Sequence, residues 1–291
     1  MTSPTRRAFL RWLRPPALVA VAWPLAGISS FEALFAPSAE LWPRWQAHDP
    51  EATASIDHSA WTRLLQAYVH RDGDGLNRVD YGGVSAADRA TLKSYLDGLA
   101  AVPIDAYSRV EQRAYWINLY NALTVQVVLD HYPVESIRDI EISPGLFADG
   151  PWDKALITVA GEPLSLNDIE HRILRPIWQD PRIHYAVNCA SVGCPNLQTA
   201  AFTATTTEAL LESAARDYVN SPRGLEAMDD GLVVSSIYVW FEEDFGGTDE
   251  AVIAHLSRYA EPETLAKIER AATLSDHRYD WSLNDGRRPG S

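Results

Sequence analysis

Residues 182–197 read Arg-Ile-His-Tyr-Ala-Val-Asn-Cys-Ala-Ser-Val-Gly-Cys-Pro-Asn-Leu, and they contain both cysteines of the 291-residue chain. The part from Ile183 to Val187 is rich in β-branched and aromatic residues, which predicts a short buried strand. A polar loop follows, in which Cys189 and Cys194 flank four small residues. A strand that ends in a loop carrying thiol, imidazole and amide side chains is typical of a functional site. We therefore expect the rest of the fold to be built around this stretch.

Three hypotheses compete for the two cysteines. In an exported protein such a pair commonly forms a structural disulfide, here Cys189–Cys194. Alternatively, one thiol is a catalytic nucleophile, with a histidine as base and an amide that orients it. The third hypothesis is a metal site of His184, Cys189, Cys194 and one further ligand, although the C-x4-C spacing is looser than in most structural zinc sites. Of the two thiols, Cys194 is the expected nucleophile because Gly193 and Pro195 fix its backbone.

The N-terminus carries a targeting pattern. Arg6 and Arg7 precede a Phe-Leu pair, and residues 15–35 are mostly apolar. This resembles a twin-arginine export signal, which carries folded proteins across the bacterial inner membrane. We expect residues 1–39 to be this signal or an uncleaved N-terminal anchor, and the protein to be periplasmic or in the cell envelope. Membrane contact is expected only through this segment, if it is not cleaved.

Composition bounds the class of protein. With 46% apolar residues and ten tryptophans, the chain can bury a large core. Its formal net charge is −14 and its pI is about 4.9. Nucleic acids and anionic membrane surfaces both require a basic footprint, so neither is an expected partner.

The remaining pattern favours helices joined by short antiparallel strands. Helices are expected over residues 57–70, 86–99, 108–132, 166–174, 206–218, 249–259 and 262–273. Hairpins are expected at 155–164 and around 229–231, with short strands at 78–81 and 279–284. The predicted class is α+β: a helix-rich single domain packed on a small, mostly antiparallel sheet. This domain spans residues 40–284, and residues 285–291 form a disordered tail.

The segment 108–132 has the longest helical pattern, and we expect it to be the central buried helix. It contains Trp116, with Asn118 and Asn121 three positions apart on one face. Asparagine is a poor helix former, so two asparagines on a buried helix need a reason. They are either core amides that bond to neighbouring loops or residues that line the site.

A second histidine precedes the cysteine loop. Ser165 and Asp168 have the spacing of a capping box, and Glu170 and His171 follow one turn into the predicted helix. His171 is close in sequence to the cysteines, which makes it a candidate base. The alternative is an ordinary surface histidine on a solvated helix face.

Five stretches carry a resemblance to a known family. They are 115–123 (YWINLYNAL), 164–171 (LSLNDIEH), 180–186 (DPRIHYA), 189–195 (CASVGCP) and 279–284 (YDWSLN). Together they resemble the family catalogued as domain of unknown function 547 (DUF547), across nearly all of residues 57–284. In that family the second cysteine is often followed by Pro-Pro, whereas Pro195-Asn196 stands here. The resemblance implies which residues form a site and leaves the reaction open.

The preferred hypothesis is an exported thiol-dependent hydrolase or acyl-transferase that acts on a small-molecule or peptide substrate. The candidate catalytic residues are Cys194, Cys189, His184, His171, Glu170 and Asn188, and the candidate substrate-binding residues are Trp116, Asn118, Asn121 and Asn196. One alternative is a non-catalytic envelope binding protein whose Cys189–Cys194 disulfide staples a binding loop. A second is a metal-dependent enzyme that uses His184, Cys189 and Cys194. No cofactor is expected, with zinc as the one alternative.

Overall fold

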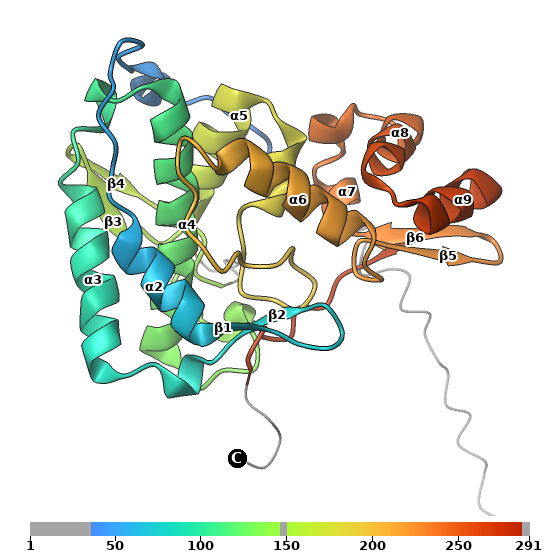
Figure 1. The fold of residues 1–291 in the computed structure, drawn as a ribbon, viewed down its shortest axis with the longest axis horizontal. Coiled ribbons are helices and arrows are strands. Elements are labelled where there is room, and N and C mark those ends of the chain that lie inside the picture. Colours follow the sequence, from blue (N-terminus) through green and yellow to red (C-terminus); the bar gives the residue numbers. More distant parts are fainter. Residues whose placement is uncertain (1–35, 146–149, 287–291) are drawn as a thin grey trace, which may run out of the picture.

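The computed structural model describes residues 36–145 and 150–286 (Figure 1). The proposed export signal falls almost entirely within residues 1–35, outside the described residues. Within the described ranges, no helix combines the length and apolar character that a membrane span needs.

Three helices pack together in one half of the molecule: α2 (Ser59–Tyr68), α3 (Ala86–Ala100) and α4 (Arg109–His131). The central helix α4 is buried along most of its length. Its Trp116 is 1% exposed and packs edge-on against Trp45, with ring centroids 5.0 Å apart. The prediction of a central buried helix is therefore confirmed.

The strands of the described residues form three small sheets. Two are antiparallel hairpins, and the third has three strands in which β6 pairs antiparallel with β5 and parallel with β7. The strands are β1 (Val69–Arg71), β2 (Asn77–Val79), β3 (Ile157–Val159), β4 (Glu162–Leu164), β5 (Leu225–Met228), β6 (Gly231–Ser235) and β7 (Leu274–Arg278). Pairing is therefore mostly antiparallel, as predicted, but it is divided among separate sheets.

The other half of the molecule surrounds the three-stranded sheet. Helices α8 and α9 pack there, drawn in red in Figure 1, and α6 joins the two halves. The bounds are α6 (Thr207–Val219), α7 (Ile237–Trp240), α8 (Asp249–Tyr259) and α9 (Pro262–Ala271). Each half has its own cluster of buried apolar side chains. The helix-rich α+β class is confirmed.

The segment that contains the second candidate histidine is a π-helical turn, Asp168–Leu174, followed by α5 (Arg175–Trp178). The predicted capping box is present, because Ser165 Oγ accepts from Asp168 N and Asp168 Oδ2 accepts from Ser165 N. A π-helical turn shifts the backbone register and commonly occurs at functional sites.

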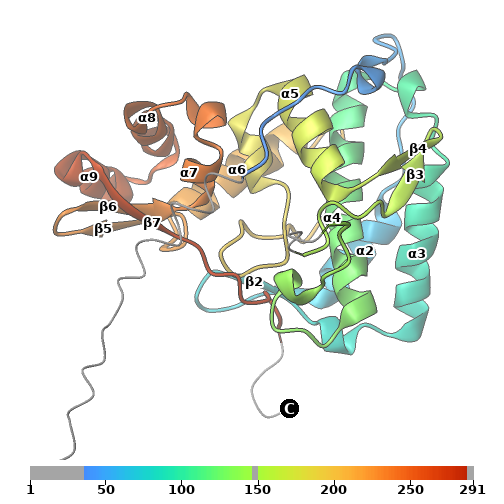
Figure 2. The same cartoon turned by 180° about the vertical axis from the view of Figure 1, so that it is seen from behind.

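An N-terminal strap, residues 37–46, runs across this π-helical turn and α5, in dark blue in Figure 2. The backbone N–H groups of Glu40 and Trp42 donate to the carbonyls of His171 and Arg172, at 2.9 and 3.0 Å. The strap ends in a short 3₁₀ helix, Pro43–Gln46, whose Trp45 is buried in the core. The strap thus supplies hydrogen bonds to carbonyls of the π-helical turn.

Two predicted strands are wrong. Ile183–Val187 lies mostly in a 3₁₀ helix, Pro181–Tyr185, whose N-cap Asp180 accepts from the backbone N–H of Arg182. A short apolar run is compatible with either a buried strand or a buried helical turn, and the capping Asp-Pro pair favours the helix. The last strand is β7, which ends before Tyr279, whereas residues 279–284 form an extended segment that packs against the cysteine loop.

Candidate functional site

The cysteine loop is held in place by the C-terminal segment 279–284. Backbone N–H groups of Val192 and Gly193 donate to the carbonyls of Ser282 and Asp280, each at 2.8 Å. Asn284 N donates to Ala190 O at 2.9 Å. The backbone of the loop is therefore fixed by a segment about ninety positions later in the chain.

Gly193 is needed for this close approach. A Cβ atom there would lie 2.7 Å from the backbone nitrogen of Asp280, closer than side chains normally come. The residue of the loop with a left-handed backbone is Ala190, with a φ of 61°, and not Gly193. A non-glycine residue in this region carries local strain, which the surrounding hydrogen bonds must offset.

The two thiols and two hydroxyls form a compact group, here called the thiol cluster: Cys189, Ser191, Cys194 and Tyr279. The sulfurs are 3.3 Å apart, and Cys189 Sγ lies 3.2 Å from Ser191 Oγ and 3.1 Å from the Tyr279 hydroxyl. Both cysteines are free; Cys189 is partly exposed and Cys194 is buried. A disulfide bond requires about 2.05 Å between the sulfurs, so the predicted Cys189–Cys194 bridge is absent here.

The environment separates the two thiols by acidity. Hydrogen bonds from Cys194 first, and then from Ser191 and Tyr279, lower the pKa of Cys189 to about 7. Burial raises the pKa of Cys194 well above its ordinary value, and the adjacent Cys189 adds to the effect. Because the thiolate is the reactive form, this geometry favours Cys189 as nucleophile, in contrast to the predicted Cys194.

The histidines belong to a separate charged cluster: Glu170, His171, Arg175, His184 and Asp244. His184 Nε2 is 2.6 Å from Asp244 Oδ2, and its Nδ1 is 3.6 Å from Glu170 Oε1. The ring of His184 also stacks on Phe241, with centroids 4.4 Å apart. Both ring nitrogens of His184 therefore face carboxylates.

Arg175 connects the other members of the charged cluster. Its Nε donates to Asp244 Oδ2 at 2.6 Å, and its Nη1 lies 3.0 Å from His171 Nδ1. The same Nη1 donates to the backbone carbonyl of Pro37 in the strap, at 2.7 Å. The strap therefore also covers the charged cluster.

Charge fixes the protonation of this cluster. Burial alone would lower the pKa of His184, but Asp244 and Glu170 outweigh it and raise that pKa. Burial lowers the pKa of His171 to about 4. The pKa of Glu170 falls to about 2, because the neighbouring His171, His184 and Arg175 outweigh the effect of burial. Two carboxylates thus favour the protonated form of His184, and burial favours the neutral form of His171. The contacts described for both rings lie within the charged cluster and not at a thiol.

Tyr120 of α4 brings the two clusters into electrostatic contact. It is 1% exposed. Burial raises its pKa well above the ordinary value, and the charges of Glu170, Cys189 and Cys194 add to this, together with a hydrogen bond to Glu170. The thiol cluster and the charged cluster are therefore neighbours, as the sequence order suggested.

The predicted metal ligands are not gathered in one place. His184 faces Asp244 and Glu170, whereas Cys189 and Cys194 face Ser191 and Tyr279. In the described ranges, no group of three or more histidine, cysteine, aspartate or glutamate side chains is arranged to hold a metal ion. The hypothesis of a site built from His184, Cys189 and Cys194 does not fit this geometry.

The asparagines and Trp116 have structural surroundings. Asn118 bonds twice to the backbone of Phe202, and Asn121 bonds to Ala186 O and Asn188 N. The side chain of Asn188 bonds to Pro195 O, Ala190 N and Asn284 Nδ2 within or beside the loop. Asn196 bonds to Gly75 O, Asn77 N, Asp217 and Arg223. Asn121, Asn188 and Asn196 position the loop, Asn118 holds the backbone at Phe202, and the buried Trp116 forms core. The geometry gives none of them an open face for a substrate.

Sequence reasoning missed Ser191, Tyr279, Tyr120, Arg175 and Asp244. A signal existed for Tyr279, because it lies in the YDWSLN stretch that carried the family resemblance. Asp244 stands sixty positions after His184 in a run of acidic residues that gives no hint of its partner.

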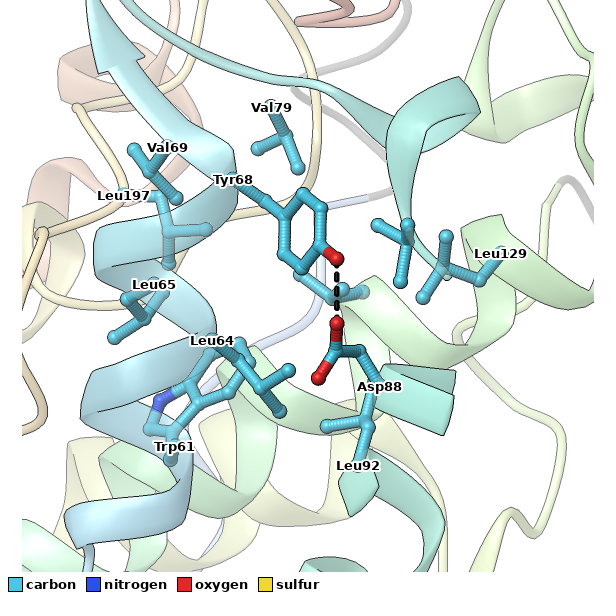
Figure 3. Close-up of a pocket in the computed structure, with 12 residues that line it drawn as sticks. Trp61, Leu64, Leu65, Tyr68, Val69, Val79, Asp88, Leu92, Leu129 and Leu197 are labelled. Atoms are coloured by element: carbon cyan, nitrogen blue, oxygen red, sulfur yellow. Dashed lines mark hydrogen bonds between the residues drawn. The ribbon is translucent and has the colours of Figure 1, made fainter. Parts of the chain in front are cut away.

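A small apolar cavity lies away from both clusters, among α2, α3 and α4 (Figure 3). Its volume of about 20 Å³ exceeds the ~10–15 Å³ that one water needs. Its wall includes a hydrogen bond of 2.6 Å from the Tyr68 hydroxyl to Asp88. None of the candidate site residues lines it.

Comparison with known proteins identifies a family model that matches part of the chain. No curated protein matches the chain, and no solved structure matches it. The segment from the start of the turn before α4 to the end of α6 contains both cysteines, Glu170, His171, Arg175 and His184. This segment, residues 104–219, matches the model of the family described as "Protein of unknown function, DUF547".

Proposed function

We propose that the protein is a thiol-dependent acyl-transfer enzyme, a hydrolase or an acyl-transferase, in which Cys189 is the nucleophile. The observation that supports it is a partly exposed thiol whose pKa is lowered to about 7 by three neighbouring donors. A thiol with that pKa is about half ionised at neutral pH and needs no histidine base. The proposed substrate is a small molecule or peptide that carries an ester, thioester or amide carbonyl.

The proposed acyl transfer needs no cofactor, because it involves no change of oxidation state. The Cys189 thiolate attacks the acyl carbonyl, the S–C bond forms, the bond from the carbonyl carbon to the leaving group breaks, and the leaving group takes up a proton from the solvent. Water or an acceptor nucleophile then attacks the thioester, restoring the thiolate and releasing a proton. The hydroxyls of Ser191 and Tyr279 are within 3.2 Å of the sulfur and stabilise the thiolate before the attack and after it is restored.

The charged cluster has a positioning role in this proposal. His184 lies in the 3₁₀ helix that leads into the loop, and its two carboxylate partners fix that helix. The proposed place of action is the periplasm or cell envelope, reached through the Arg6-Arg7 signal. Replacing both arginines by lysine is expected to retain the precursor in the cytoplasm.

The central test is alkylation by iodoacetamide as a function of pH, followed by mass spectrometry of the cysteine peptides. We expect modification at Cys189 with a midpoint near pH 7 and none at Cys194 in the folded protein. An activated ester such as p-nitrophenyl acetate should acylate the same residue, and Cys189→Ser should abolish both reactions. Modification of Cys194 first, or a midpoint at the ordinary thiol pKa, would refute the proposal.

A second candidate function rests on the 3.3 Å between the sulfurs. With a small-molecule disulfide as oxidant, the two thiols form one protein disulfide and release two small thiols. The Cys189–Cys194 disulfide would then cross-link the loop, as in the hypothesis of a non-catalytic envelope binding protein. Purification under alkylating, non-reducing conditions distinguishes the states: two carbamidomethyl groups after unfolding indicate the dithiol, and none indicates the staple.

A further inference from the structure

The carbonyl groups of the cysteine loop contact a different part of the fold from its N–H groups. Two backbone N–H groups of the loop donate to the C-terminal segment 279–284. The carbonyls of residues 192–194 instead accept from side chains at the end of α6 and in the turn after it. Arg223 Nη1 donates to the first of them at 3.2 Å and also to the third, and the Tyr218 hydroxyl donates to the second at 2.6 Å. Two side chains thus hold three consecutive carbonyls.

A tight turn places Arg223 against the loop. It belongs to the sequence Ser-Pro-Arg-Gly at 221–224, in which Gly224 N donates to Ser221 O at 3.0 Å. A Cβ atom at Gly224 would overlap the carbonyl oxygen of Tyr218, so the turn can close on the helix only with glycine at this position. The guanidinium lies 5.5 Å from the centre of the Tyr218 ring, a cation–π contact. The turn and the ring together fix the direction in which Arg223 extends.

The guanidinium also binds a third acceptor. Its Nη2 donates to Asn196 Oδ1 at 3.0 Å, and the same oxygen accepts from Asn77 N at 2.9 Å. Arg223 therefore spans the loop from Val192 to Asn196, across Cys194. A planar guanidinium presents its donors in a fixed fork and can hold several acceptors at set positions, whereas an ammonium group is a point charge.

The contact with the Cys194 carbonyl is important because the Cys194 thiol acts on Cys189. The two sulfurs are 3.3 Å apart, and Cys194 Sγ accepts from Cys189 N at 3.1 Å. Among the hydrogen bonds that lower the pKa of Cys189 to about 7, the one from Cys194 has the largest effect. Hydrogen bonds weaken steeply with distance and angle. A small displacement of the Cys194 backbone would therefore weaken its hydrogen bond to Cys189.

We propose that Arg223 is a positioning residue of the thiol cluster: by holding the carbonyls of Val192 and Cys194, it keeps the Cys194 thiol directed at Cys189. The effect of Arg223 on the reactivity of Cys189 therefore passes through Cys194. Its consequence for acyl transfer rests on the proposed function, in which Cys189 is the nucleophile.

The test is a double-mutant cycle on the full chain, measured as the pH midpoint of Cys189 alkylation by iodoacetamide. Arg223→Met should move the midpoint from near pH 7 to between about 7.5 and 8, which slows alkylation at pH 7 about twofold to fivefold. In the Cys194→Ala background, the same substitution should leave the midpoint unchanged. With a wild-type midpoint near pH 7, an equal shift in both backgrounds, or no shift in either, would overturn the inference.

Two further variants control for charge and for general effects on α6. Arg216→Met removes another arginine from the last turn of α6. The contacts described for its side chain are with Glu212 and Tyr259, so the midpoint should not change. Arg223→Lys keeps the charge but not the fork, and its midpoint should lie between those of the wild type and Arg223→Met. If Arg223→Met does not fold, Arg223→Lys takes its place in the cycle, and the same outcomes decide.

Oxidation with glutathione disulfide gives a second measurement. Cys189 first forms a mixed disulfide and releases one glutathione. Cys194 then attacks the Cys189 sulfur, which forms the protein disulfide and releases the second glutathione. A displaced Cys194 slows this second step, so the mixed disulfide should accumulate to about fivefold more in Arg223→Met than in the wild type or Arg216→Met. Mass spectrometry of the acid-quenched protein measures it.

The two measurements separate the two proposals. If wild-type Cys189 has the alkylation midpoint of an ordinary thiol, but the mixed disulfide accumulates only in Arg223→Met, the acyl-transfer proposal fails and the role of Arg223 stands. If Cys189 reacts with a midpoint near pH 7 in the wild type and in both Arg→Met variants, the nucleophile stands and the inference about Arg223 is wrong. An ordinary midpoint together with equal accumulation in all three proteins would refute both.

Discussion

The thiol cluster and the charged cluster are neighbours, yet they stabilise their polar groups in opposite ways. In the charged cluster every ion faces a counter-ion, so the group is electrically balanced and tied to the fold. In the thiol cluster, neutral donors surround one sulfur, which lowers the pKa of Cys189 without placing a fixed charge beside it. Balanced charges make a rigid support, whereas donors around a weak acid make a reactive group.

The largest expected effect on the free energy of unfolding comes from a substitution in the charged cluster. Arg175→Met removes the guanidinium from Asp244, which keeps only His184, and removes the donor to the Pro37 carbonyl, so the free energy of unfolding should fall by about 3–5 kcal/mol. Denaturation with urea measures this. If the two clusters have separate roles, the folded variant should still alkylate Cys189 with an unchanged pH midpoint.

Lys93→Met is the control, since it removes an exposed ion pair with Asp97 that should contribute about 0.5 kcal/mol or less. A similar small loss for Arg175→Met would show that the charged cluster does not support the fold.

The next effect concerns pH. The pKa of Glu170 is lowered to about 2 from an ordinary 4.5, so its stabilising contribution is present above the ordinary value and is lost as the pH falls towards 2. Glu170→Gln should lower the free energy of unfolding by about 2–3 kcal/mol at pH 7. The difference in free energy of unfolding between the variant and the wild type should become smaller as the pH falls from 5 to 2. A gap that stays constant over this range would show that Glu170 is not an ion in the folded protein.

A smaller effect is expected where the C-terminal segment meets the loop. Gly193→Ala places a Cβ against the backbone of Asp280, so we expect a loss of about 1–3 kcal/mol and a higher alkylation midpoint as Tyr279 moves away. Gly98→Ala is the matched control in α3, where nothing lies within 4 Å of the added Cβ. It should stabilise by about 0.5–1 kcal/mol. Equal behaviour of the two variants would contradict the close contact.

Substitution of Cys194 is expected to have the smallest effect on stability. It should, however, clearly change the reactivity of Cys189. Cys194→Ala removes the hydrogen bond that lowers the pKa of Cys189 most, so the pKa of Cys189 should rise and alkylation at pH 7 should slow about tenfold. Cys194→Ser retains a donor and should react at nearly the wild-type rate. Identical rates for the two variants would mean that the Cys194 thiol does not stabilise the thiolate.

The sequence predicted local features well and distant partners poorly. Helix α4 was expected at 108–132 and spans Arg109–His131, because its apolar pattern is long and periodic. The Ser165–Asp168 capping box was found because both partners lie within one turn. The partners of Cys189 and His184 could not be found in this way, since Tyr279 and Asp244 lie ninety and sixty positions away.

The choice between the two thiols failed for a related reason. The Gly193–Pro195 frame suggested a fixed backbone at Cys194, but acidity depends on exposure and on nearby donors. Those are set by the packing of residues 279–284 on the loop, which no local pattern describes.

The packing of residues 279–284 on the cysteine loop also means that the site can form only late in synthesis of the chain. The donor Tyr279 follows Cys189 by ninety residues, so at ordinary synthesis rates roughly 5–20 s pass between the two on the ribosome. During that interval Cys189 lacks the Tyr279 hydroxyl, and its loop lacks the backbone hydrogen bonds to residues 280–284. A nascent or truncated chain therefore lacks one of the three donors to Cys189, and the complete site is assembled only when the fold is nearly complete.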